Sequence, residues 1–201
     1  MSAPSLSHRR RYRRLAALAL LLAAPAATAA AQAPDTAALA GVRGEALQQI
    51  VDAERKFVAL AEAMPAEKYS WRPAAGVRSV SEVYMHMVGA NYLIPGMAGV
   101  KPAAGVTLTR DMETRVTDKA QVVDMLKKSF AYLRQGVREV PDDQLDAAVR
   151  LFGRPATKRG VLVAIATHAH EHLGQSIAYA RMNGVVPPWS RGPDAAAGGD
   201  R

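Results

Sequence analysis

The chain has 201 residues, and because 49% are hydrophobic but only 5% aromatic, aliphatic side chains must fill most of a core. The formal net charge of +8 is uneven: five of the 26 basic residues lie before residue 15, and without them the balance is 21 minus 18, or +3. The folded part therefore has no basic stripe of the kind that binds nucleic acid, and the absence of cysteine excludes disulfides and thiolate metal ligands.

Residues 1–33 have the pattern of a secretory signal peptide. A basic HRRRYRR segment precedes the apolar run Leu15–Ala24, and small residues then offer cleavage sites after Ala31 or Ala33. An uncleaved anchor is the weaker alternative, because Pro25 interrupts a run that is shorter than the roughly 20 residues of a spanning helix. We expect an exported protein, periplasmic or secreted, without membrane association after cleavage. The paired arginines leave general secretion and twin-arginine export both open.

The first predicted helix covers residues 35–64. Glu54 lies on its apolar stripe and allows two interpretations: a residue at the edge of the helix seam with its carboxylate in solvent, or a buried carboxylate near a cation. Apolar residues recur at intervals of three and four, namely Leu39, Val42, Leu47, Ile50, Val51, Phe57, Val58, Ala61 and Met64.

A second helix is predicted from Ser79, which forms a capping box with Glu82, to Pro95. His86 lies about two turns inside it. Alone, such a histidine would be a core imidazole hydrogen-bonded to a neighbour. Residues 95–116 lack periodicity, and a loop of this length could be a lid or a plain surface connection.

Thr117 is predicted to cap a third helix that ends at Pro141. Its basic residues are interpreted as a solvated face, and they are Lys127, Lys128, Arg134 and Arg138. Its buried stripe is expected to comprise Val122, Val123, Leu126, Phe130, Leu133, Val137 and Val140.

The connection 141–156 is expected to hold a short turn around residues 144–149, and Thr157 then caps the last helix. A tail at 191–201 is expected to be disordered. With four long helical patterns and no convincing strand, residues 35–190 are predicted to form an all-α four-helix bundle with one long crossover loop. The apolar face of the last helix is expected to comprise Val161, Leu162, Ile165, Leu173, Ile177 and Met182.

His168 and His172 are the central chemical feature of the last helix. Four residues apart, they lie about 40° apart on one face, whereas His170 projects to nearly the opposite side. Gln175 shares their face and could support a site. A third imidazole, from His86, could converge on the pair in the middle of a bundle. Three imidazoles suit a divalent transition metal such as Zn, Ni, Fe or Mn and leave coordination positions open.

The order of these features resembles the DinB-like (DinB/YfiT) superfamily of metalloenzymes. The resemblance rests on SWRPAAGVRSVSEVYMH before and in the second helix and on HAHEHLGQSIAYARMNGVVPPWS at the end of the domain. The family's H-x-x-x-H-x-G-Q helix maps onto His168, His172, Gly174 and Gln175, and its helix-2 histidine onto His86. Many relatives have two adjacent histidines where this chain has Glu171 and His172. The resemblance implies a four-helix bundle, often a homodimer, with three histidines around a divalent metal.

The function expected from these residues is a metal-dependent hydrolase or transferase acting on an unidentified small molecule. His86, His168 and His172 would be metal ligands, and Glu54 and Gln175 would support the site or transfer protons. Two alternatives stay open. One is an exported bundle that binds a metal or an apolar ligand without catalysis, and the other is a structural bundle whose histidines are core residues.

Overall fold

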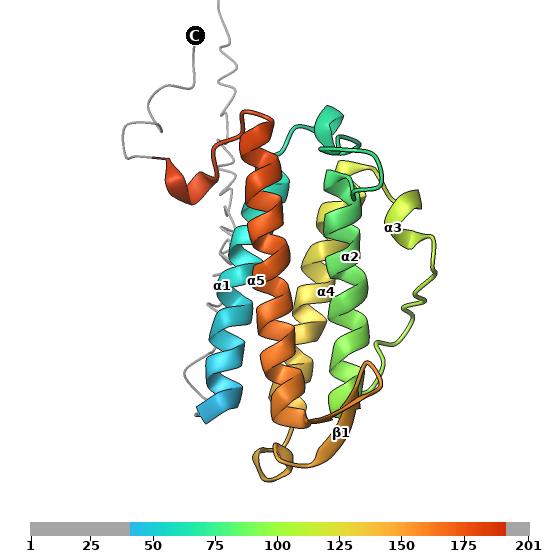
Figure 1. Cartoon of the computed structure of the whole chain (residues 1–201), viewed down its shortest axis with the longest axis vertical. Helices are drawn as coiled ribbons and strands as arrows, with labels where there is room; N and C mark the ends of the chain where they lie inside the picture. Colours follow the sequence, from blue (N-terminus) through green and yellow to red (C-terminus); the bar gives the residue numbers. More distant parts are fainter. Residues whose placement is uncertain (1–40, 192–201) are drawn as a thin grey trace, which may run out of the picture. The chain divides into compact units, whose positions relative to one another are not determined.

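The computed structural model describes residues 41–191, in which four long helices form a bundle (Figure 1). The helices are α1 (Gly41–Ala63), α2 (Val80–Leu93), α4 (Lys119–Glu139) and α5 (Lys158–Met182). Each packs on two others, in the cyclic order α1, α5, α2, α4. Within the described range, every helix is too short or too polar to cross a membrane.

Parts of the sequence-based prediction lie outside the described residues. They are the signal peptide at 1–33, the first six residues of the predicted first helix, and residues 192–201 of the predicted tail. Of the remainder, the four helices and the long crossover are confirmed.

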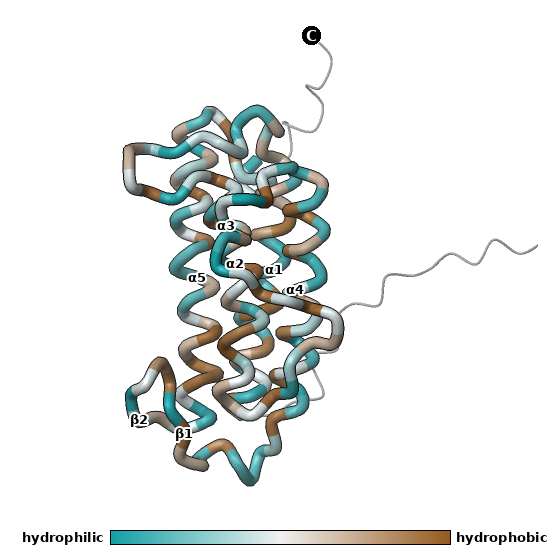
Figure 2. Tube along the Cα trace, turned by 90° about the vertical axis from the view of Figure 1, so that its right-hand side faces the viewer, coloured by the Kyte–Doolittle hydropathy of each residue, from teal (hydrophilic) through white to brown (hydrophobic). Residues whose placement is uncertain are grey.

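The long crossover follows from the direction of the helices. Figure 1 shows α1 and α5 running one way and α2 and α4 the other, so the chain leaving α2 must travel back along the bundle to begin α4. The connection begins as the 3-10 helix Ile94–Ala98 and includes the short helix α3 (Met112–Arg115). Both views place α3 beside α2, on the outside of the bundle (Figures 1 and 2). A segment without periodicity in the sequence thus contains a short, defined helix.

The core lies inside the bundle, where the apolar faces of the four long helices pack against one another. Phe57 packs against Phe130 and Tyr84 with ring centroids 5.8 and 6.3 Å apart, joining α1, α4 and α2. In Figure 2 hydrophobic positions gather toward the middle of the bundle and hydrophilic ones toward its edges. The predicted stripes are largely confirmed, but Met182 was wrongly assigned to the apolar face of α5, since it is 63% exposed. It lies in the last turn of α5, where the helix passes its packing partners.

The helix ends agree with the predicted caps at two of three positions. Ser79 and Glu82 form the capping box of α2. At the start of α5, the Thr157 hydroxyl accepts a hydrogen bond from the Gly160 amide. At α4 the cap is Asp118 rather than Thr117, with the Asp118 carboxylate accepting the Gln121 amide. A carboxylate here also interacts favourably with the helix dipole.

The prediction of no strand in the connection to α5 was wrong, because a β-hairpin precedes that helix. Strand β1 (Ala148–Leu151) pairs antiparallel with β2 (Arg154–Thr157). The two turn residues, Phe152 and Gly153, have φ of 49° and 81°, as a two-residue hairpin turn of the mirror-image type requires. Phe-Gly is an unusual pair for this turn, and Pro155 argues against a strand, so the pattern was missed.

Candidate metal centre

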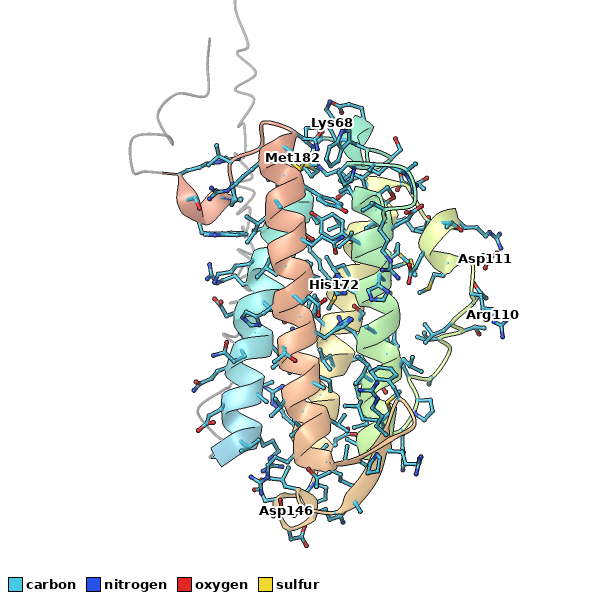
Figure 3. All side chains as sticks on the ribbon, in the orientation of Figure 1. Lys68, Arg110, Asp111, Asp146, His172 and Met182 are labelled. Carbon is cyan, nitrogen blue, oxygen red and sulfur yellow. The ribbon has the colours of Figure 1, made fainter. Side chains whose placement is uncertain are left out.

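The three predicted histidines meet halfway along the bundle, at the seam between α2 and α5. His86 comes from α2, and His168 and His172 come from successive turns of α5; Figure 3 labels His172 at this level. One ring nitrogen of each lies within 4.8 Å of the others. The ring centroids are 4.6 to 5.3 Å apart, so the three imidazoles form a compact triangle.

The spacing of the ring nitrogens fits a metal ion. His86 Nε2 lies 3.3 Å from His168 Nε2. Two imidazole nitrogens at about 2.0–2.1 Å from a tetrahedral zinc would be about 3.3–3.4 Å apart, so this pair needs little movement to bind one. Neutral nitrogen ligands of this kind suit several first-row divalent metals. The donor set therefore fits the metal implied by the sequence, without distinguishing among Zn, Ni, Fe and Mn.

The orientation of the His172 ring is fixed by a hydrogen bond with Gln175. Its Nδ1 lies 2.8 Å from Gln175 Oε1, and because an amide oxygen only accepts, Nδ1 carries the proton and Nε2 is left to bind a metal. Gln175 Nε2 in turn donates to the Tyr179 hydroxyl at 3.0 Å, and the Tyr179 ring packs edge-on against Trp71. Gln175 thus lies on the face the sequence predicted, as a support for His172.

His86 is oriented by Glu113, which was not among the predicted site residues. Glu113 is in α3, and its Oε1 lies 2.8 Å from His86 Nδ1. Its other carboxylate oxygen accepts a hydrogen bond from Arg78 Nε, also at 2.8 Å. Metal-bound histidines commonly donate their second ring N–H to a carboxylate. This common pairing, together with a carboxylate in the long loop, could have suggested such a residue. The periodicity of the sequence, however, did not show that the loop lies beside α2.

The surroundings of His168 and His172 favour the neutral forms of these two imidazoles. Burial, reinforced by the neighbouring His172 and His86, lowers the pKa of His168 from 6.5 to about 4. Burial also lowers the pKa of His172, although the hydrogen bond with Gln175 opposes the shift. Burial alone would raise the pKa of Glu113, but its bonds to Arg78 and His86 outweigh this and lower it. The site thus presents neutral nitrogens from His168 and His172 and an ionised carboxylate beside His86, and both features suit a divalent cation.

Comparison with known proteins identifies the family. The model of the DinB superfamily matches residues 49–176, which include all three histidines and most of the bundle. The chain belongs to the DinB superfamily. No curated protein matches it in sequence.

Several solved structures share the fold of this DinB-superfamily protein. A DinB-like protein from Bacillus cereus is 22% identical, with a TM-score of 0.62, covering 71% of this chain and 93% of its own. A DinB-like protein from Bacillus subtilis is 20% identical, with a TM-score of 0.55 and the same coverages. A conserved protein from Enterococcus faecalis is 17% identical, with a TM-score of 0.56, covering 72% of this chain and 98% of its own. At these identities the comparisons establish the fold alone.

Glu54, predicted to support the site or transfer protons, pairs with a residue of α4, a helix that carries none of the three histidines. Its carboxylate forms an ion pair with Arg134 of α4, and the two side chains are 18% and 24% exposed. Glu54 is therefore the partly buried carboxylate beside a cation that the sequence allowed, but its partner is an arginine. The prediction that Arg134 belongs to a solvated face was wrong, because this pair draws it into the α1–α4 seam.

Two other residues of α5 complete the surroundings of the site. His170 lies outside the triangle, with Nδ1 3.0 Å from the Ala166 carbonyl oxygen, as the helical geometry predicted. Glu171 is exposed, and its negative charge acts to raise the pKa of both His168 and His172. Glu171 thus places a carboxylate within electrostatic reach of the cluster.

Proposed function

We propose that this DinB-superfamily protein is a divalent-metal-dependent enzyme, a hydrolase or transferase, that acts on a small molecule at a three-histidine site. The observation that carries the proposal is the convergence of His86, His168 and His172. The rings of His86 and His172 are also held by hydrogen bonds at Nδ1, from Glu113 and Gln175 respectively, so that their Nε2 atoms are left for the ion. Three protein ligands leave a coordination position for water or substrate.

The chain's own residues would hold and orient the ion at a place that solvent can reach. The His86 side chain is 24% exposed and the other two rings are partly buried, so the cluster lies near the surface of the α2–α5 seam. A bound divalent ion would supply Lewis acidity and lower the pKa of a bound water. Glu171 is the carboxylate we propose for proton transfer, because it is exposed and its charge acts on two of the ligands.

A second candidate function is an exported bundle that binds a metal without catalysis. The observation that favours it is that two candidate acids are already engaged: Glu54 is paired with Arg134, and both oxygens of Glu113 are bonded. Export and a homodimer remain parts of both proposals. Export is supported by the signal-like pattern of residues 1–33, and the homodimer by the resemblance to the family.

The test is metal-dependent turnover by the untagged mature protein. Protein loaded in turn with Zn, Ni, Fe or Mn is assayed against chromogenic carboxylic and phosphate esters, amides, and thiols paired with an electrophile. The enzyme proposal expects turnover with one metal, abolished by chelation and by His172→Ala. It also expects Glu171→Gln to slow turnover while metal content stays at the wild-type level. Stoichiometric metal without turnover on any class would favour the binding function.

A further inference from the structure

The short helix α3 and the stretch before it bury little of their surface. In the approach to it, residues 101–111 are exposed with the single exception of Ala103, and α3 itself has no buried residue. Figure 3 shows Arg110 and Asp111 on this outer stretch of the connection. Segments with so little buried surface open at low free-energy cost, so a small number of specific contacts must hold α3 in place.

Two of the contacts that hold α3 lie on the face of α2 that carries the metal ligand, and a third is made by Arg78, just before α2. The Met112 methyl lies over Gly89, 3.6 Å from where a β-carbon would be, and Gly89 is three residues from His86 on the same side of the helix. The Glu113 carboxylate bonds to His86 Nδ1 with one oxygen and to Arg78 Nε with the other. The bond that fixes α3 is therefore also the bond that orients a ligand.

We infer that Glu113 is a positioning residue of the metal centre, and that docking of α3 on α2 is coupled to occupation of the site by a metal. The inference rests on the proposed metal site. An ion on His86 Nε2 confines the ring proton to Nδ1, where it can only be donated toward Glu113. Without an ion the ring also has the other tautomer, which cannot donate this bond. The ion thus strengthens the main polar contact of α3, and the contact in turn holds the ring toward the ion.

The size of this coupling follows from reciprocity. Removing a carboxylate that supports a metal-binding histidine typically costs about 10–100-fold in metal affinity. Because coupling between two equilibria is mutual, a metal must favour the docked α3 by the same factor. A segment with so little buried surface would respond measurably to a factor of this size. Residues 101–116 therefore act as a flap that closes on α2 when the metal binds.

The experiment compares Glu113→Ala with a matched control, Asp111→Asn. Asp111 is two residues away on the same segment, is exposed, and pairs with Arg115 rather than with the bundle. Glu113→Gln is the conservative variant, since its amide oxygen can still accept the His86 proton but carries no charge for Arg78. Zn²⁺ affinity is measured by competition with a chelating dye. Hydrogen exchange across residues 101–116 and tryptic cleavage at Arg110 are measured with and without Zn²⁺.

The expected result is that Zn²⁺ slows exchange and cleavage in the wild type and in Asp111→Asn. Glu113→Ala should bind Zn²⁺ about 10–100-fold more weakly and should lose most of this protection even when saturated, with Glu113→Gln in between. Unchanged affinity in Glu113→Ala, or equal protection of its flap at saturation, would overturn the inference while leaving the metal site intact. A wild type that binds no Zn²⁺, Ni²⁺, Fe²⁺ or Mn²⁺ would instead overturn the proposed function, and the inference with it.

Discussion

Acidification should destabilise the metal-free protein through its histidine cluster. His168 has a pKa of about 4 in the folded chain against 6.5 ordinarily, so the unfolded chain binds this proton more readily. The stabilising contribution is therefore fully present above about pH 6.5 and is lost progressively as the pH falls toward 4. The lowered pKa of His172 acts in the same direction.

The size of this loss in folding free energy can be calculated for a pH range in which the carboxylates stay ionised. Between pH 7.5 and 5, a histidine with these two pKa values loses about 2 kcal/mol of its contribution to folding. The ring is only partly buried, so solvent screening reduces this to about 1 kcal/mol. Glu113 does not interfere, because its pKa is lowered and its protonation falls below this window.

The assay is urea unfolding at pH 7.5 and pH 5 in the presence of a chelator, for the wild type and for His168→Gln. Glutamine keeps a polar side chain of similar length but cannot be protonated. The variant should lose about 1 kcal/mol less stability between the two pH values than the wild type does. Equal losses would refute the reasoning, because they would show that the clustered imidazoles do not resist protonation.

Two further predictions concern side-chain contacts of α4, one with α1 and one with the long connection. Glu54→Gln should lower the free energy of unfolding by about 1 kcal/mol, because Arg134 loses its ionic partner while partly buried, and metal content should stay unchanged. Full stability with lost turnover would instead support the catalytic role predicted for Glu54. Gly136→Ala should lower the melting temperature, because a β-carbon there would lie 2.9 Å from Val100 Cγ1, and overpacking of about 1–3 kcal/mol exceeds the gain in helix propensity of about 1 kcal/mol. Val100→Ala should make the same substitution neutral or stabilising, and an additive effect of the two changes would contradict this explanation.

The sequence predicted the parts of the fold that periodicity and capping determine. Apolar stripes at helical spacing and the caps at Ser79 and Thr157 specify the helices locally, and the long gap between two of them predicts a crossover. The hairpin before α5 was not predicted because its turn is formed by Phe152 and Gly153. Phe152 has a left-handed backbone conformation that its residue type rarely adopts. Only pairing between the strands reveals it.

The site was predictable where its ligands share a helix face. His168, His172 and Gln175 are related by helical spacing alone, and His86 completes the set once two helices are assumed to pack antiparallel. Glu113 was not predictable, because its role depends on where an aperiodic connection crosses α2. Likewise, the position of Glu54 on the apolar stripe was correct, but the sequence could not show that Arg134 would reach it.

The measurement that tests the central claim most directly is the metal content of the mature protein, purified without a histidine tag, beside His168→Ala. We expect about one divalent transition-metal ion per chain in the wild type, after reconstitution if necessary, and less than a tenth of that in the variant, since the variant lacks a nitrogen of the triangle. A wild type that takes up no such ion, or a variant that retains it fully, would contradict the account and leave the three histidines as packing residues of the α2–α5 seam.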